Sequence, residues 1–400
     1  MARPFEGLRV IDATHVLAGP FAAYQMAALG AEVIRVERPD DPDQSRLQGT
    51  DPALNAARMG TAYLAQGSGK RSVALDLKHP AAQAVMRRLV AGADVFVQNF
   101  RPGALDALGL GHAAMAALNP RLVYCSISAY GQTGPRAAET GYDNVFQATS
   151  GLMAMTGTDA SGPLRAGAPV VDYATGYMAA FAISAALLRR ATEGVGAHVD
   201  LSMFEAALML MSAPIAGLTV GGQAPGPQGN RFPSACLGTY AARDGLLMIG
   251  ASNLRQQRRL WAALGRPDMV RESFDAGRES HAEDAAALAA IFATGDCARW
   301  ETLLRHHRVP AARVRTLPEA LADPQLAARG LLQQPGTLPG SEVPLTLPVA
   351  PFRISGGGDP VIDRPPPALG ADTDAVLRDM GFGPAEIADL RRSGAIAPGD

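Results

Sequence analysis

Short apolar runs alternate with helical stretches along the N-terminal part of the chain. Residues 8–12 and 31–37 have the apolar pattern of buried strands, and the stretch between them, which begins at Gly19-Pro20, has the pattern of a helix. The alternation continues with three more strand-like runs, at residues 72–76, 94–98 and 122–126. Strands joined by helices of this length form a parallel sheet with helices on both faces. The pattern therefore predicts an α/β fold.

The pattern changes further along the chain. Residues 221–227 are rich in Gly and Pro, as linkers are, and residues 237–250 predict a β-hairpin that turns at Asp244-Gly245. Helical patterns follow, and residues 372–393 predict a final helical hairpin. We therefore expect a Rossmann-like large domain, a linker with a smaller α+β domain, and a C-terminal return to the large domain, at residues 1–220, 221–335 and 336–400.

One carboxylate, Asp172, lies between a turn-rich loop at residues 157–169 and a long apolar segment that continues to Arg190. We expect a helix to begin just after Asp172. Two compatible interpretations follow. Asp172 could be an N-cap, whose side chain accepts the first free backbone N–H groups. It could also be a nucleophile, because a helix N-terminus lowers the pKa of a carboxylate and keeps it ionised.

The composition indicates a globular protein with a large core. The chain has 400 residues, of which 48% are hydrophobic, and its formal net charge is -2, with 36 Lys and Arg against 38 Asp and Glu. A general nucleic-acid binder would need a clear basic excess, so nucleic acid is not an expected partner. An anionic ligand would have to bind at a local cluster of charge.

Cysteine usage and apolar runs bear on the compartment. Three cysteines, Cys125, Cys236 and Cys297, lie far apart, which supports neither a disulfide framework nor a zinc motif. The N-terminus lacks a signal-peptide pattern. The longest apolar runs, residues 178–188 and 206–220, are shorter than the ~20 residues that span a bilayer. We expect a cytoplasmic protein with no membrane partner.

Cationic residues recur near the ends of the predicted strands. Ligands of parallel sheets bind beyond the carboxyl ends of the strands. Arg38, Lys70, Arg71 and Arg101 lie in or beside those loops. Each alone is most often a solvated charge. Their recurrence on one edge of the sheet favours a polyanionic ligand.

Other motifs fail on spacing or position. Residues 67–70 resemble a phosphate-binding loop, but Leu64 and Arg71 stand where Gly and Ser or Thr are required. Residues 109–114 fit a dinucleotide fingerprint loosely but do not follow a first strand, so we expect no nicotinamide cofactor. No serine lies in a G-x-S-x-G elbow. The histidines lack metal-ligand spacing, so we expect no metal; they are His15, His79, His112, His198, His281, His306 and His307.

Several stretches together resemble the class III CoA-transferases of the formyl-CoA and carnitine CoA-transferase type, a family that includes α-methylacyl-CoA racemases. The similarity covers almost the full chain. The stretches that carry it are residues 7–12, 18–20, 29–39, 69–72, 99–103 and 141–143. The family's nucleophile is an aspartate just before an apolar helix, and Asp172 falls on it.

The resemblance also implies that CoA, as substrate and carrier, lies along the loops after the strands. Arg and Lys there suit its phosphates through charge-assisted hydrogen bonds, and small residues permit close approach of the backbone. The positions that match CoA contacts are Val16, Ala18, Arg38, Lys70, Arg71, Asn99, Phe100 and Ala104.

The chain departs from the family pattern on the substrate side. The racemase branch has a histidine in the middle of a Gly-His-Asp motif, whereas this chain has Tyr142, whose phenol is a poor base at neutral pH. That difference favours transfer over epimerisation. An arginine and a glutamine of formyl-CoA transferase fall at Ala107 and Leu17, which makes the same substrate doubtful. His15 and Gly250 are further substrate-side candidates; the loop near Gly250 and the turn at residues 129–131 are candidate oxyanion donors.

The expected reaction is acyl-CoA:carboxylate CoA transfer through an aspartyl-CoA thioester on Asp172. Succinyl-CoA is an expected donor, and succinate, itaconate, mesaconate and citramalate are expected acceptors. The alternatives are a racemase-like enzyme acting on the α-proton of an acyl-CoA, and a CoA-binding protein without turnover. The resemblance further implies a homodimer of interlocked chains.

Overall fold

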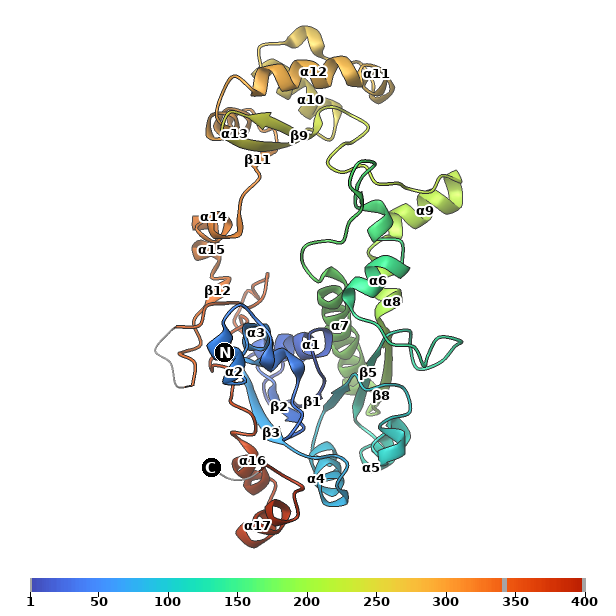
Figure 1. Cartoon of the computed structure of the whole chain (residues 1–400), viewed down its shortest axis with the longest axis vertical. Helices are drawn as coiled ribbons and strands as arrows, with labels where there is room; N and C mark the ends of the chain where they lie inside the picture. The colour runs from blue at the N-terminus through green and yellow to red at the C-terminus, as the bar shows by residue number, and fades with distance from the viewer. Residues whose placement is uncertain (1, 340–343, 398–400) are drawn as a thin grey trace. The chain divides into compact units, whose positions relative to one another are not determined.

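The computed structural model describes residues 2–339 and 344–397, which form two compact units (Figure 1). The larger unit comprises Met1–Met153, Arg165–Ala224 and Ala327–Asp400 within the described residues. The smaller unit comprises Ala154–Leu164 and Pro225–Leu326. Each unit has its own apolar core.

The larger unit is built on a six-stranded sheet in the order β3-β2-β1-β4-β5-β8. Every neighbouring pair is parallel, which confirms the α/β prediction. The order reverses between β1 and β4, so the loops after these two strands diverge and leave room for a ligand. The strands are β1 Arg9–Ala13, β2 Glu32–Glu37, β3 Lys70–Ala74, β4 Val95–Gln98, β5 Val123–Ser128 and β8 Ala197–Ser202.

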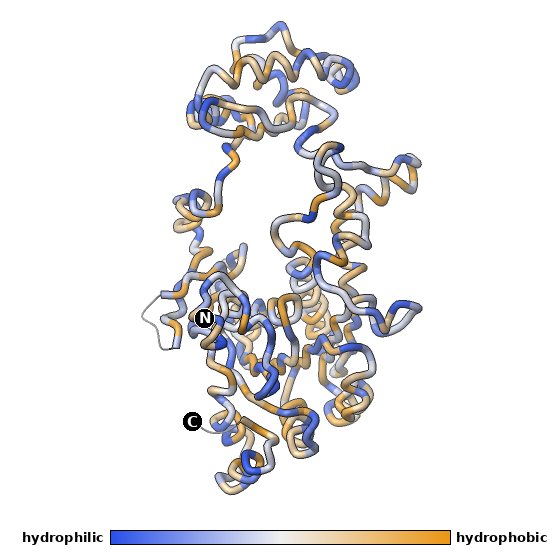
Figure 2. Tube along the Cα trace, viewed as in Figure 1, coloured by the Kyte–Doolittle hydropathy of each residue, from blue (hydrophilic) through white to orange (hydrophobic). Residues whose placement is uncertain are grey.

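Helices cover both faces of this sheet because successive strand residues point to opposite sides. Val10 belongs to the core on one face, where α1 Ala18–Ala28, α7 Val170–Glu193 and α8 Met203–Met209 pack. Ile11 belongs to the core on the other face, under α4 Pro80–Ala91, α16 Thr373–Asp379 and α17 Pro384–Arg392. Helices α16 and α17 confirm the predicted C-terminal hairpin. Figure 2 shows apolar residues along the strands and these helices.

The close packing of α1 against α7 fixes the start of α7 beside the loop after β1. All residues of α1 are buried. A Cβ added at Gly176 of α7 would lie 2.7 Å from the carbonyl oxygen of Ala18, so only glycine allows the two helices to approach this closely. Phe21 makes T-shaped ring contacts with Tyr173 and Tyr177 at centroid distances of 4.9 and 4.8 Å.

Within the described residues, α7 is the single helix that is long and apolar enough to cross a membrane by length and composition. Core helices of globular proteins have the same properties. Val171, Ala179 and Ile183 of α7 are fully buried in the core against the sheet.

The smaller unit contains an antiparallel sheet of β9 Leu237–Ala242, β10 Gly245–Gly250 and β11 Ala311–Arg313, in the order β11-β10-β9. Ala242 pairs with Gly245, which confirms the hairpin predicted at Asp244-Gly245. Four helices surround the core of Trp261, Phe292 and Trp300: α10 Leu254–Ala263, α11 Phe274–Glu279, α12 His281–Phe292 and α13 Cys297–His306.

Short elements complete the described chain. The helices are α2 Pro52–Ala56, α3 Thr61–Gly67, α5 His112–Leu118, α6 Asp143–Thr149, α9 Ser212–Gly221, α14 Leu317–Leu321 and α15 Pro324–Arg329. The 3₁₀ turns are Gln44–Leu47, Asp106–Leu108, Met153–Met155 and Pro267–Met269. The two-residue strands are β6 Gly157–Thr158, β7 Gly162–Pro163, β12 Leu332–Gln333 and β13 Leu347–Pro348.

Candidate active site

Two neighbouring cavities lie beside the loops that follow β1, β2 and β4. The first has a volume of about 550 Å³ and the second about 520 Å³. They share part of their walls, formed by His15, Val16, Phe100 and Tyr142. The divergence of the loops after β1 and β4 therefore produces a long, divided site at the place where parallel sheets bind ligands.

The structure brings most of the candidate residues to these cavities. Arg38 and Ala104 line the first cavity, and Asp172 lines the second. The other predicted residues on the walls are His15, Val16, Leu17, Ala18, Asn99, Phe100 and Tyr142. Residues far apart in the chain thus meet at one edge of the sheet.

Lys70 and Arg71 do not line either cavity, so we correct the expectation that their side chains contact CoA. Lys70 is fully buried, and its Nζ donates to Asp12 Oδ2 at 2.7 Å and to the Pro20 carbonyl at 2.8 Å. Arg71 pairs with Glu32 and Asp379, each at 2.8 Å. Because carboxylates already hold both cations, these charges belong to the framework of the sheet.

The loops after β1 and β4 are joined directly. The N–H of His15 donates to Asn99 Oδ1 at 2.9 Å, and Asn99 Nδ2 donates to the His15 carbonyl at 2.9 Å. The His15 ring meets Phe100 edge-on, with centroids 4.9 Å apart. Neighbouring atoms desolvate part of the His15 imidazole and lower its pKa, although the residue is exposed at the surface. This pairing holds the shared wall of the cavities in place.

The start of α7 differs from the sequence prediction. The helix begins at Val170, so Asp172 is its third residue and not the residue before it. Asp143, at the start of α6, supplies the cap instead: its Oδ1 accepts from the N–H groups of Val171 at 2.7 Å and Asp172 at 3.2 Å. The N-cap interpretation of Asp172 was therefore wrong.

The electrostatic expectation for Asp172 was wrong as well. The side chain is buried at the wall of the second cavity, with 9% of its surface exposed. Burial, and then the negative charge of Asp143, raise the pKa of Asp172 to about 7. A helix N-terminus lowers a pKa through its free N–H groups. Here two of those groups donate to Asp143, which adds a like charge beside Asp172.

Asp143 also organises the loop before α7. Its Oδ2 accepts from Gln147 Nε2 at 2.5 Å, and Gln147 Oε1 accepts from the Ala166 N–H at 2.8 Å. Sequence reasoning missed this role, although Asp143 belongs to the Gly141-Tyr142-Asp143 motif. The motif drew attention to Tyr142, which is 57% exposed, whereas the buried Asp143 beside it caps α7.

The candidate oxyanion donors differ in their positions and in their hydrogen bonds. Gly250 ends β10 in the smaller unit, and its N–H donates to the Pro310 carbonyl at 2.8 Å, so this group is not free for substrate. Ala129 lines the second cavity. Ser128, which sequence reasoning did not single out, also lines it, and its buried hydroxyl oxygen has no hydrogen-bond partner within residues 2–339 and 344–397. The Ser128 hydroxyl is therefore a further candidate donor.

The chain is similar to known proteins in both sequence and structure. The sequence profile of CoA-transferase family III matches residues 5–373. The chain is 34% identical over 392 residues to succinate–glutarate CoA-transferase of Agrobacterium fabrum, covering 94% of this chain and 96% of the relative. It is 34% identical to acetyl-CoA:oxalate CoA-transferase of Acetobacter aceti, covering 89% and 90%. A crystal structure of a CaiB/BaiF family protein from Brucella suis has 30% identity and a TM-score of 0.82, covering 95% and 100%.

The pKa of Asp172 provides a test of this geometry. Asp143→Asn keeps an oxygen for the α7 N–H groups but removes the negative charge, so we expect the pKa of Asp172 to fall below 7. Difference infrared spectroscopy of the carboxyl band, with Asp172→Asn as the reference, measures the pH midpoint of the Asp172 titration. Glu139→Gln, which alters a different carboxylate that lines the second cavity, should leave this midpoint unchanged. An unchanged midpoint in Asp143→Asn would contradict the like-charge account.

Proposed function

The chain belongs to CoA-transferase family III, and we propose that it moves CoA between an acyl-CoA and a small dicarboxylic acid, with Asp172 as the residue that carries CoA. The chain is an acyl-CoA:carboxylate CoA-transferase. The observation that supports the role of Asp172 most strongly is its position: a buried carboxylate on the wall of a cavity that shares a wall with another large cavity.

The first cavity suits the nucleotide end of CoA. Arg38 and Lys78 line it and offer cations to phosphate groups. Its apolar wall, formed by Leu75, Leu77 and Leu108, suits an adenine ring. The Arg38 guanidinium contacts Asp40 at 2.7 Å and is 35% exposed, so a phosphate would compete with a solvated carboxylate and not with a buried one.

The pantetheine arm would run from the first cavity along the shared wall to Asp172. His15, Val16 and Phe100 form that wall, and the small residue Ala18 follows on the side of the second cavity. The walls are held by the pairing of His15 with Asn99. In this arrangement the thioester lies in the second cavity, beside the Asp172 carboxylate and the Ser128 hydroxyl.

In the first half-reaction the ionised Asp172 attacks the thioester carbonyl, and the carbon–sulfur bond breaks to give an acyl-aspartyl anhydride and CoA thiolate. The thiolate then attacks the aspartyl carbonyl, so that the donor acid leaves as a carboxylate and CoA becomes bound to Asp172. The acceptor carboxylate reverses these steps. A pKa of about 7 leaves a substantial fraction of Asp172 ionised at neutral pH while keeping it more basic than an exposed aspartate.

The proposed acceptor is a small dicarboxylate. The relatives in Agrobacterium fabrum and Acetobacter aceti are named for succinate, glutarate and oxalate. In this chain Arg101 lines the second cavity with Asp172 and can pair with the carboxylate that does not react. Succinyl-CoA is the proposed donor for the same reason.

Asp172→Asn tests the proposed nucleophile. The amide has nearly the same shape but does not attack a thioester, so kcat with succinyl-CoA and glutarate should fall by at least about 10³-fold. Mass-spectrometric detection of glutaryl-CoA gives the rate. Asp159→Asn, an exposed carboxylate that lines neither cavity, is the matched control and should keep wild-type turnover. Substantial turnover by Asp172→Asn would rule out the proposed role.

A homodimer is the proposed assembly. None of the residues of α9 is buried, although the helix is rich in apolar side chains such as Ile215, Leu218 and Val220, the last 90% exposed. On α7, Phe181 and Leu188 are 77% and 71% exposed. Apolar surfaces of this kind mark association sites. Interlocking of the two chains remains a prediction.

The cytoplasm is the proposed compartment, since the three cysteine thiols are buried and unpaired.

Phe181→Glu tests the proposed interface. A charge on this surface should convert a dimer to a monomer, because burying an unpaired carboxylate opposes association. Sedimentation velocity at micromolar concentration measures the assembly state. Leu118→Glu, which adds the same charge at another exposed apolar position, should remain dimeric. A wild-type protein that sediments as a monomer would contradict the proposal.

A further inference from the structure

Val16, in the wall shared by the two cavities, has an unusual backbone conformation. Its φ is 68°, in the left-handed region, where β-branched residues are strongly disfavoured. Within the described residues, the other non-glycine residues with positive φ are Arg58 and Arg308, which line neither cavity. Such strain persists only where surrounding contacts impose it. Contacts with other residues must therefore hold Val16 in the left-handed conformation.

The contact that holds Val16 is the carboxylate of Asp43. The Val16 N–H donates to Asp43 Oδ2 at 2.9 Å and to Oδ1 at 3.1 Å. Asp43 Oδ1 also accepts from the Ser45 N–H at 2.9 Å, which fixes the carboxylate from its own side of the loop. Asp43 lines the first cavity together with Val16, but only 6% of its surface is exposed.

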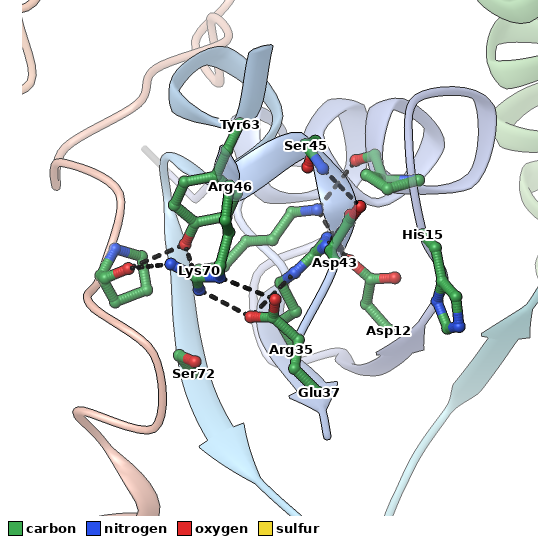
Figure 3. A network of polar contacts seen from close by, with 12 residues as sticks. Asp12, His15, Arg35, Glu37, Asp43, Ser45, Arg46, Tyr63, Lys70 and Ser72 are labelled. Carbon is green, nitrogen blue, oxygen red and sulfur yellow. Dashed lines mark hydrogen bonds and ion pairs between the residues drawn. The ribbon is translucent and has the colours of Figure 1, made fainter. Parts of the chain in front are cut away.

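Asp43 is in turn held by a buried network of charges (Figure 3). Arg35, fully buried, forms an ion pair with Asp43 and lies 3.5 Å from Asp12 and 3.2 Å from Glu37. Lys70 neutralises Asp12, and Arg46 pairs with Glu37 at 2.6 Å. The members are three carboxylates, Asp12, Glu37 and Asp43, and three cations, Arg35, Arg46 and Lys70.

The charges within this network keep Asp12 and Glu37 ionised. Burial alone would raise the pKa of Asp12, but Lys70 and Arg35 outweigh it and hold that pKa below its usual value. The guanidiniums of Arg35 and Arg46 likewise outweigh burial and hold the pKa of Glu37 at about 2. The network is therefore a buried set of ion pairs, and the carboxylate of Asp43 accepts from the Val16 N–H at its edge.

We propose that Asp43, anchored by Arg35, is a positioning residue that holds Val16 in the left-handed conformation and so sets the wall along which acyl-CoA reaches Asp172. The inference rests on the proposed path of CoA along this wall. Without the carboxylate, Val16 would relax to negative φ, and His15 and Leu17 on either side of it would move. The predicted result is a weaker and misaligned hold on acyl-CoA, without any change in the reacting groups.

The test is a rescue experiment with Asp43→Ala and Val16→Gly. Glycine adopts positive φ without steric cost, so the loop no longer depends on Asp43. We expect Asp43→Ala to raise KM for acyl-CoA by about tenfold or more and to change kcat less. The double variant should bring KM most of the way back to the wild-type value. Tyr63→Phe is the matched control: Tyr63 bonds to Arg46 within the network but lines neither cavity, so it should lower Tm and leave KM unchanged.

Hydrogen exchange of the Val16 amide in the free protein gives a readout that does not require transferase activity. The amide should exchange slowly in the wild type and much faster in Asp43→Ala. If Asp43→Ala does not fold, Asp43→Asn, which keeps the volume and one acceptor oxygen, should show the same changes to a smaller degree and the same rescue. Wild-type KM and exchange in a folded Asp43 variant, or no rescue by Val16→Gly, would overturn the proposal. Inactive wild-type protein with these exchange changes intact would instead count against the proposed function alone.

Discussion

Two carboxylates, Asp143 and Asp172, meet at the first turn of α7, and the first N–H groups of the helix donate to Asp143. This division of hydrogen bonds sets the electrostatic environment of Asp172. Asp143 accepts these hydrogen bonds, while Asp172 lies beside it, buried and more basic than a free aspartate. A carboxylate that titrates near neutral pH at the wall of the second cavity follows from this arrangement.

The sheet supplies the rest of the site by placing distant loops at one edge. The switch in strand order between β1 and β4 opens the loops, and the pairing of His15 with Asn99 fixes how far they open. The buried network of charges, most of whose members lie on β1, β2 and β3, then holds Val16 in a strained conformation in the wall shared by the cavities. Buried charge thus acts on the wall that the two cavities share.

The sequence predicted elements whose signals are local. Parallel strands followed from apolar runs such as that around Val10 and Ile11, and the β9–β10 hairpin followed from Asp244-Gly245. Asp172 was chosen as the candidate nucleophile from its predicted place before an apolar helix and from the family resemblance. Its pKa could not be found in that way, because Asp143 caps α7 from another helix, 28 residues earlier in the chain than Val171. Lys70 looked like a ligand for phosphate because nothing local shows that it lies against Asp12 across the sheet.

The central claim is that CoA becomes covalently bound to Asp172 during transfer. The most direct measurement is intact-mass and peptide-mass analysis of the enzyme after incubation with succinyl-CoA alone, with and without hydroxylamine. We predict a protein that carries CoA as a thioester and that hydroxylamine converts to a hydroxamate in the peptide containing Asp172. A wild-type enzyme that turns over with acceptor present, yet carries no adduct on this residue under single-turnover conditions, would contradict the account.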